Sequence, residues 1–186
     1  MAEEQIDGTG RGFKAKVNSR NRTSVSAASY SESRMISAQD GQTFIWTTSA
    51  SADTGEYIVY LQCMSTDLRL IIDKVTVNGV LAGLFELYMV TGTAAGGSAI
   101  TGTITNRTKG ILANANARGD GEVTGLSDGS RVDLARTAAN GRATMELNDV
   151  LILGQDDAIG IKYTGGTGIV DTIITGYFKH HSELDK

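Results

Sequence analysis

Beyond Gln42 the chain alternates between short runs rich in β-branched and aromatic residues and turns built from Gly, Asn and Asp. No convincing helix separates the runs, and short strands spaced in this way are typical of an antiparallel β-sandwich or barrel. In two runs apolar and polar residues partly alternate, as half-buried strands require. The ten predicted strands are Thr43–Thr48, Glu56–Ser65, Leu68–Asn78, Gly83–Thr91, Ile100–Thr105, Ser130–Thr137, Ala143–Leu147, Val150–Leu153, Ala158–Thr164 and Ile169–Lys179.

The connections between these runs carry recognisable turn signals. Asn78-Gly79 lies between two apolar runs and predicts a two-residue hairpin, because both residues tolerate positive φ. Residues 106–129 are polar and small, and a long excursion of this kind inside a compact domain is commonly functional. We expect an exposed loop or protruding hairpin there that contacts a partner. Its candidate partner-binding residues are Asn106, Arg107, Lys109 and Arg118.

Residues 1–42 differ from the strand-rich body, residues 43–186, because they are polar and rich in Gly and Ser. Between positions 11 and 34 six basic residues accompany one acidic residue, Glu32, although the whole chain has a net charge of −4. The few apolar residues are spaced like anchors of an extended strand. Two interpretations stay open, an arm that meets an acidic partner and a solvated tail. As an arm, the segment would bind through Arg11, Phe13, Lys14, Lys16, Val17, Arg20 and Arg22.

One motif formally matches a catalytic signature. Gly125-Leu-Ser127-Asp-Gly129 fits the Gly-x-Ser-x-Gly nucleophile elbow, which needs a strand before the Ser, a helix after it, and a downstream acid and His. The residues after it read as a strand, and the only histidines, His180 and His181, lie close to the C-terminus. We therefore expect the protein not to be an enzyme.

Metal and cofactor sites are also not expected. The adjacent carboxylates Asp156 and Asp157 could hold a hard cation with nearby carbonyls, or they could simply form a turn. A zinc site would need a third ligand besides the two histidines, and Cys63 is the single cysteine. Cys63 lies in an apolar run, so we expect a buried thiol.

Membranes and nucleic acids are not expected partners either. The N-terminal residues lack a secretory signal, and no window approaches the 18 apolar residues of a membrane helix. The basic segment could bind nucleic acid in principle. Against this, the sequence pI is near 5.2, whereas nucleic-acid-binding domains are usually basic. We expect a soluble protein made in a cytoplasm.

Three segments carry a resemblance to a known class of proteins: Gly10–Asn18, Asn21–Val25 and the C-terminal Ile173–Phe178. Together with the strand-rich body between them, their order resembles that of small structural proteins of tailed bacteriophages. The chain looks most like the jelly-roll virion proteins that include capsid decoration, or cement, proteins.

The resemblance implies an all-β, jelly-roll-like antiparallel β-sandwich with an extended N-terminal arm. It further implies a homotrimer that binds the major capsid protein on the outer surface of the virion, after synthesis in the bacterial host cytoplasm. A neck, tail or baseplate component of the same particle is the alternative. A carbohydrate-binding module is a third reading, which requires exposed aromatic residues, whereas Trp46, Tyr57 and Tyr60 lie in apparently buried runs.

Overall fold

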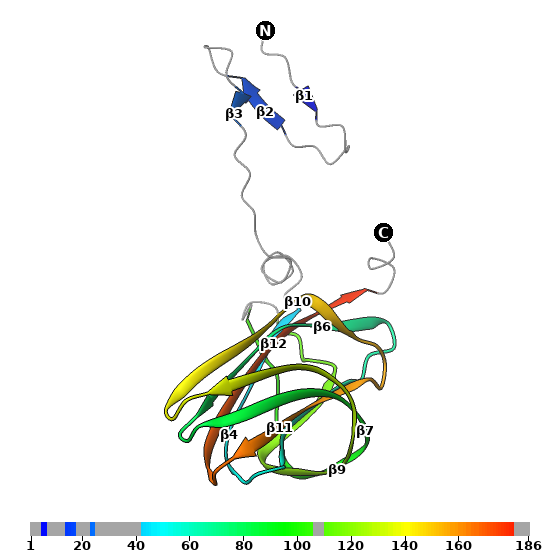
Figure 1. The fold of residues 1–186 in the computed structure, drawn as a ribbon. Helices are drawn as coiled ribbons and strands as arrows, with labels where there is room; N and C mark the ends of the chain where they lie inside the picture. The colour runs from blue at the N-terminus through cyan, green and yellow to red at the C-terminus, as the bar shows by residue number, and fades with distance from the viewer. Residues whose placement is uncertain (1–4, 7–13, 18–22, 25–41, 106–109, 181–186) are drawn as a thin grey trace. The chain divides into compact units, whose positions relative to one another are not determined.

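The computed structural model describes residues 5–6, 14–17, 23–24, 42–105 and 110–180 (Figure 1). The chain divides into two compact units, Met1–Ser31 and Glu32–Lys186. In the first unit, short strands form an antiparallel sheet in the order β1-β2-β3. These strands are β1 (Gln5–Ile6), β2 (Lys14–Val17) and β3 (Thr23–Ser24).

The second unit is all-β over its described residues, which confirms the predicted fold class. Its strands match the predicted runs closely where those runs are apolar, because the β-branched and aromatic residues there fill a core. The strands are β4 (Thr43–Ala52), β5 (Tyr57–Cys63), β6 (Leu68–Gly79), β7 (Gly83–Ala99), β8 (Thr103–Ile104), β9 (Ala115–Thr137), β10 (Gly141–Leu153), β11 (Ala158–Gly165) and β12 (Gly168–His180).

The strand pairing is that of a jelly roll. Four antiparallel pairs are nested in the sequence: β4 with β12, β5 with β11, β6 with β10, and β7 with β9. Such nesting is what a long hairpin gives when it is rolled up into two sheets. One sheet, here called the open sheet, has the order β10-β6-β12-β4-β8. The other, called the closed sheet, has the order β11-β5-β9-β7 and closes on itself.

Closure of the second sheet depends on β9, the longest strand. Its residues 118–137 pair with β7, and its residues 115–123 also pair with β5. The β7–β9 ladder is interrupted by several bulges, at which glycines such as Gly92, Gly96 and Gly125 adopt positive φ. Bulges of this kind bend strands and increase their twist. The two strands therefore curl far enough for β9 to reach β5, as their curved ribbons in Figure 1 illustrate.

Two cores and a small third cluster, Ile71 with Tyr177, hold the second unit together. The larger lies between the two sheets and contains Trp46, Phe85 and Tyr163 among its buried residues. Cys63 belongs to it and is fully buried, which confirms the expected state of its thiol. The smaller core takes residues from all four strands of the closed sheet, namely Tyr57, Tyr60, Val90, Val123 and Ala158. It therefore belongs to the closed sheet itself.

The hairpin predicted at Asn78-Gly79 is wrong. Gly79 is the last residue of β6 and pairs with Gly141 and Val170 in the open sheet, whereas β7 belongs to the closed sheet. The connection between β6 and β7 thus crosses from one sheet to the other. Both flanking strands have a buried face in either arrangement, so hydrophobic pattern alone does not separate a hairpin from a sheet-to-sheet crossing.

The exposed loop or hairpin predicted for residues 106–129 is wrong for residues 115–129, which belong to β9. Small and polar side chains hide this strand from a search for apolar runs. Main-chain ladders to both β5 and β7 hold it in place, and only a few of its side chains there, such as Ala117 and Val123, are buried. A second difference is that the predicted strands Ala143–Leu147 and Val150–Leu153 form one strand, β10, with a bulge between them.

Two glycines with similar backbone angles test the importance of the close β7–β9 approach. Gly92 has φ +106° and a Cβ there would collide with the carbonyl oxygen of Gly125, whereas Gly55 has φ +88° and open space around it. Gly55→Ala should lose roughly 1–2 kcal/mol of unfolding free energy from backbone strain. Gly92→Ala should lose roughly 1–3 kcal/mol more from the collision. Urea unfolding measures both, and equal losses would contradict this account of the curl.

Candidate interaction surface

The predicted arm residues lie only partly within the described residues. Lys14, Lys16 and Val17 are in β2, whose main chain pairs Lys14 with Ile6 in β1 and Lys16 with Ser24 in β3. The other predicted arm residues lie outside the described residues: Arg11, Phe13, Arg20 and Arg22.

The predicted loop residues separate in the same way. Asn106, Arg107 and Lys109 lie outside the described residues. Arg118 lies in β9 and is half-buried, and its Nη1 donates a hydrogen bond of 3.0 Å to the carbonyl oxygen of Gly96 in β7. The Arg118 side chain therefore ties two strands of the closed sheet together beside one of the glycine bulges.

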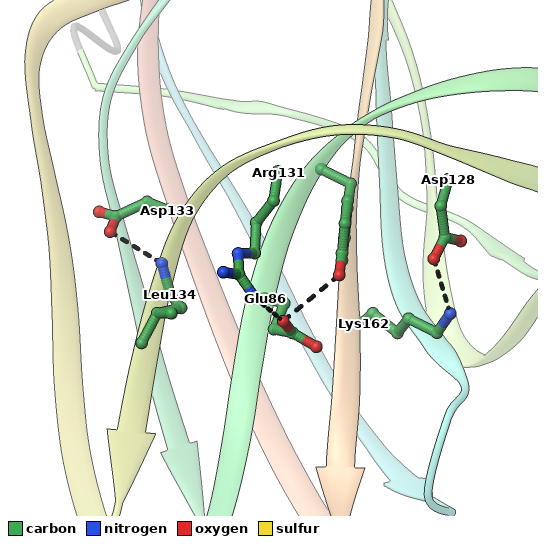
Figure 2. Close-up of polar contacts among 7 residues, drawn as sticks. Glu86, Asp128, Arg131, Asp133, Leu134 and Lys162 are labelled. Atoms are coloured by element: carbon green, nitrogen blue, oxygen red, sulfur yellow. Dashed lines mark hydrogen bonds and ion pairs between the residues drawn. The ribbon is translucent and has the colours of Figure 1, made fainter.

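The closed sheet carries a first polar group around Asp128. Tyr57 Oη donates to Asp128 Oδ1 at 2.6 Å, and Lys162 Nζ donates to Asp128 Oδ2 at 2.9 Å. Lys162 Nζ also lies 5.5 Å from the centre of the Tyr57 ring, within the range of a cation–π interaction. These contacts connect β5, β9 and β11 through side chains, and Figure 2 draws the Asp128–Lys162 pair.

A second polar group surrounds Glu86 on the neighbouring strand. Arg131 Nη1 lies 2.6 Å from Glu86 Oε1, and Tyr88 Oη donates to the same oxygen at 3.3 Å. Glu86 and Lys162 are register partners on β7 and β11, so the two groups lie side by side on the closed sheet (Figure 2). We call the two groups together the polar network.

Contacts within the polar network shift the pKa values of Asp128, Tyr57 and Arg131. Hydrogen bonds from Tyr57 and then from Lys162 lower the pKa of Asp128. Burial, followed by the hydrogen bond to Asp128, raises the pKa of Tyr57 far above its ordinary value. The Glu86 carboxylate raises the pKa of Arg131. A general base needs a pKa near the working pH, and the pKa values of Asp128 and Tyr57 are both shifted away from neutrality. These two side chains therefore suit a cross-strand contact better than proton transfer.

A groove of about 280 Å³ opens beside the network, where β5 ends and β11 begins. The Asp pair of the sequence lies here, but it is engaged in a turn. Asp157 Oδ2 accepts a hydrogen bond from the Gly154 amide at 2.8 Å, and Gln62 Nε2 donates to the Asp156 carbonyl at 3.1 Å. The groove is lined by Tyr60, Gln62, Met89, Val90, Thr91, Gly92, Gly129, Asp156, Asp157 and Ala158. Within the described ranges, no group of three or more His, Cys, Asp or Glu side chains could hold a metal ion.

The candidate nucleophile Ser127 lies inside a strand. It is exposed in β9 and pairs with Thr91, and β9 continues to Thr137, so the strand-turn-helix geometry of a nucleophile elbow is not formed at this motif. His180 ends β12, and His181 lies outside the described residues.

The aromatic residues of the carbohydrate-binding reading are buried. Trp46, Tyr57 and Tyr60 are 1%, 6% and 3% exposed. Their ring faces are therefore not open to a sugar.

The polar network is the feature that the sequence did not reveal. Tyr57 and Asp128 are 71 positions apart, and Glu86 and Arg131 are 45 apart. Each residue taken alone is an ordinary polar position on a strand. Only the β7–β9 register, which the bulges shift, decides which of them meet.

Comparison with known proteins does not assign the chain to a family. No protein-family model matches it, and no curated protein matches it significantly. In the part of the chain that the structure describes, no helix is long and apolar enough to cross a membrane.

Acid titration tests the role of Asp128. Because its pKa is lowered by folding, its stabilising effect is complete above the ordinary value of 3.8 and is lost as the pH falls through the folded value. Asp128→Asn should therefore lower the unfolding free energy by about 0.5–1.5 kcal/mol at neutral pH. The difference from the unaltered protein should shrink towards pH ~2.

Urea unfolding at several pH values measures this effect. Asp67→Asn, which removes an exposed carboxylate between β5 and β6, serves as the control for a general change of surface charge. A pH-independent difference for Asp128→Asn would contradict the assignment.

Proposed function

We propose that the chain is a structural virion protein that binds and stabilises the outer surface of a phage capsid. It acts by assembly and not by catalysis, and its direct partner is the major capsid protein. The jelly-roll pairing of the body is the observation that carries the proposal, because it agrees with the class of virion proteins that the sequence segments resemble. Because one fold serves many functions, the jelly roll alone does not select this one. The choice of a virion protein comes from the three segments that carry the resemblance, Gly10–Asn18, Asn21–Val25 and Ile173–Phe178.

The strand pairing of the body supports a role in which the protein keeps its shape under mechanical stress. Its closed sheet has no terminal strand, and the polar network fastens β5, β7, β9 and β11 to one another through side chains. Long-range strand pairing holds most of the described body, and a domain of this kind has few segments that can open locally. Such a body suits a protein that must keep its shape on a particle under internal pressure.

The N-terminal unit supports attachment. Its residues 11–31 carry five basic side chains and no acidic ones, so an acidic surface would attract them. In this proposal the unit binds neighbouring capsid subunits, and Phe13 and Val17 supply apolar anchors. Contacts of modest strength gain from repetition when several copies are linked in one assembly.

Removal of the first unit tests the attachment role. Deleting residues 1–31 leaves the second compact unit entire, so the body should remain folded, as far-UV circular dichroism and thermal unfolding would report. Co-sedimentation with particles that lack the protein should fall to background. Full occupancy by the truncated chain would contradict the attachment role.

A variant of the full chain separates charge from chain length. Lys14→Glu combined with Lys16→Glu reverses two charges in β2 and should weaken particle binding strongly, and low salt should magnify the loss. Arg136→Glu, a single exposed charge reversal on β9 in the body, is the control and should leave binding nearly unchanged. Equal effects at the two places would argue against a special role of the first unit.

A further inference from the structure

The open sheet has two edges among the described residues. At one end β8 pairs only with Phe44 and Ile45 of β4, and beyond them the main chain of β4 meets β9, where the Ser49 amide donates to Asp120 Oδ1. Among the described residues β10 pairs only with β6, and it stands at the end of the strand order, whereas the opposite end is formed by the two-residue β8. An edge strand exposes main-chain donors and acceptors to any strand that comes alongside. β10 is the longer of the two strands that stand at the ends of this sheet, and its edge is a place where another strand could add.

A bulge limits how much of this edge is regular. Residues Leu147–Val150 stand opposite the single residue Asp73, and Asn148 and Asp149 have positive φ. Bulges protect edges because they twist the strand away from a partner. The regular part is Gly141–Glu146, which pairs residue by residue with Lys74–Gly79.

The exposed side chains of this regular part form a self-complementary pattern. Arg142, Thr144 and Glu146 are exposed on one face, while Met145 is buried on the other. If a second copy of the segment ran antiparallel with Thr144 opposite Thr144, Arg142 of each copy would face Glu146 of the other. Opposite charges directly across an antiparallel pair are favourable, and like charges are unfavourable. A two-fold axis at Thr144 thus creates two Arg142–Glu146 pairs between the copies.

We propose that two copies of the chain associate through antiparallel pairing of Gly141–Glu146, with the two-fold axis at Thr144. The pairing joins two open sheets into one continuous sheet and satisfies the edge main chain of both copies. It gives an even number of copies, in contrast to the trimer that the sequence resemblance implies. The inference does not depend on the proposed function.

Exposed apolar side chains beside the edge add surface that a second copy could cover. Val150 is 81% exposed and Ile152 43% exposed on β10, and Val132 and Leu134 are exposed on β9. A groove of about 310 Å³ lies between these two strands and is lined by Val132, Asp133, Glu146, Leu147, Val150 and Leu151. Contiguous exposed apolar surface rimmed by charged residues is typical of a protein–protein interface.

A charge exchange tests the pairing in the full-length protein. Sedimentation velocity should give a dimer whose dissociation constant rises about tenfold in Arg142→Glu and also in Glu146→Arg, because each change puts like charges opposite each other twice. The double variant R142E/E146R restores both pairs, so its dissociation constant should be close to that of the unaltered protein. Asp67→Arg reverses one exposed charge on the β5–β6 connection, as each single variant reverses one on β10, and should leave the constant unchanged.

A cross-link provides a readout that does not depend on affinity. Side chains directly opposite in an antiparallel pair have Cβ atoms about 4.5–5.5 Å apart, close enough for a disulfide after a small adjustment. Thr144→Cys should therefore form a covalent dimer under mild oxidation. Asp67→Cys should not, and the single native cysteine, Cys63, is buried and does not interfere.

Three outcomes would overturn the inference. They are a monomer or a trimer at all protein concentrations, failure of R142E/E146R to restore association while circular dichroism shows it folded, and no cross-link in Thr144→Cys.

Discussion

The simultaneous pairing of β9 with β7 and with β5 is the constraint on which the rest of the structure depends. A 23-residue strand can make both pairings only if it curls strongly, and the glycine bulges of the β7–β9 ladder supply that curl. Once β9 reaches β5, the second core around Tyr57 and Tyr60 becomes enclosed, and Asp128 comes within hydrogen-bonding distance of Tyr57. The smaller core, the polar network and the groove lined by Tyr60 and Asp156 all follow from this closure.

The same closure decides where the body can meet other proteins. The closed sheet has no terminal strand, so the terminal strands of the second unit are β10 and the two-residue β8 in the open sheet. The exposed apolar side chains of β9 and β10 gather beside the β10 edge. The β10 edge in the second unit and the basic residues of positions 11–31 in the first unit are two different kinds of contact surface. The proposed assembly role would use both.

Sequence reasoning reached the strands but not the way they pair. The predicted strands Glu56–Ser65 and Ile169–Lys179 were recognisable because β-branched and aromatic residues fill the core. Residues 115–129 were not, since their strand is held by main-chain ladders and not by apolar side chains. Asn78-Gly79 was misread because a sheet-to-sheet crossing uses the same residues as a hairpin. The polar network depends on contacts 45 and 71 positions apart, which no local pattern encodes. The jelly roll was expected from resemblance and not from periodicity.

The copy number of the chain in purified virions tests the central claim most directly. Quantitative mass spectrometry against the major capsid protein measures it without any assumption about which surface is contacted. The account predicts hundreds of copies, in a fixed ratio to the capsid protein. A handful or a few dozen copies would place the chain in the neck, tail or baseplate, and its absence from the particle would contradict the virion proposal altogether.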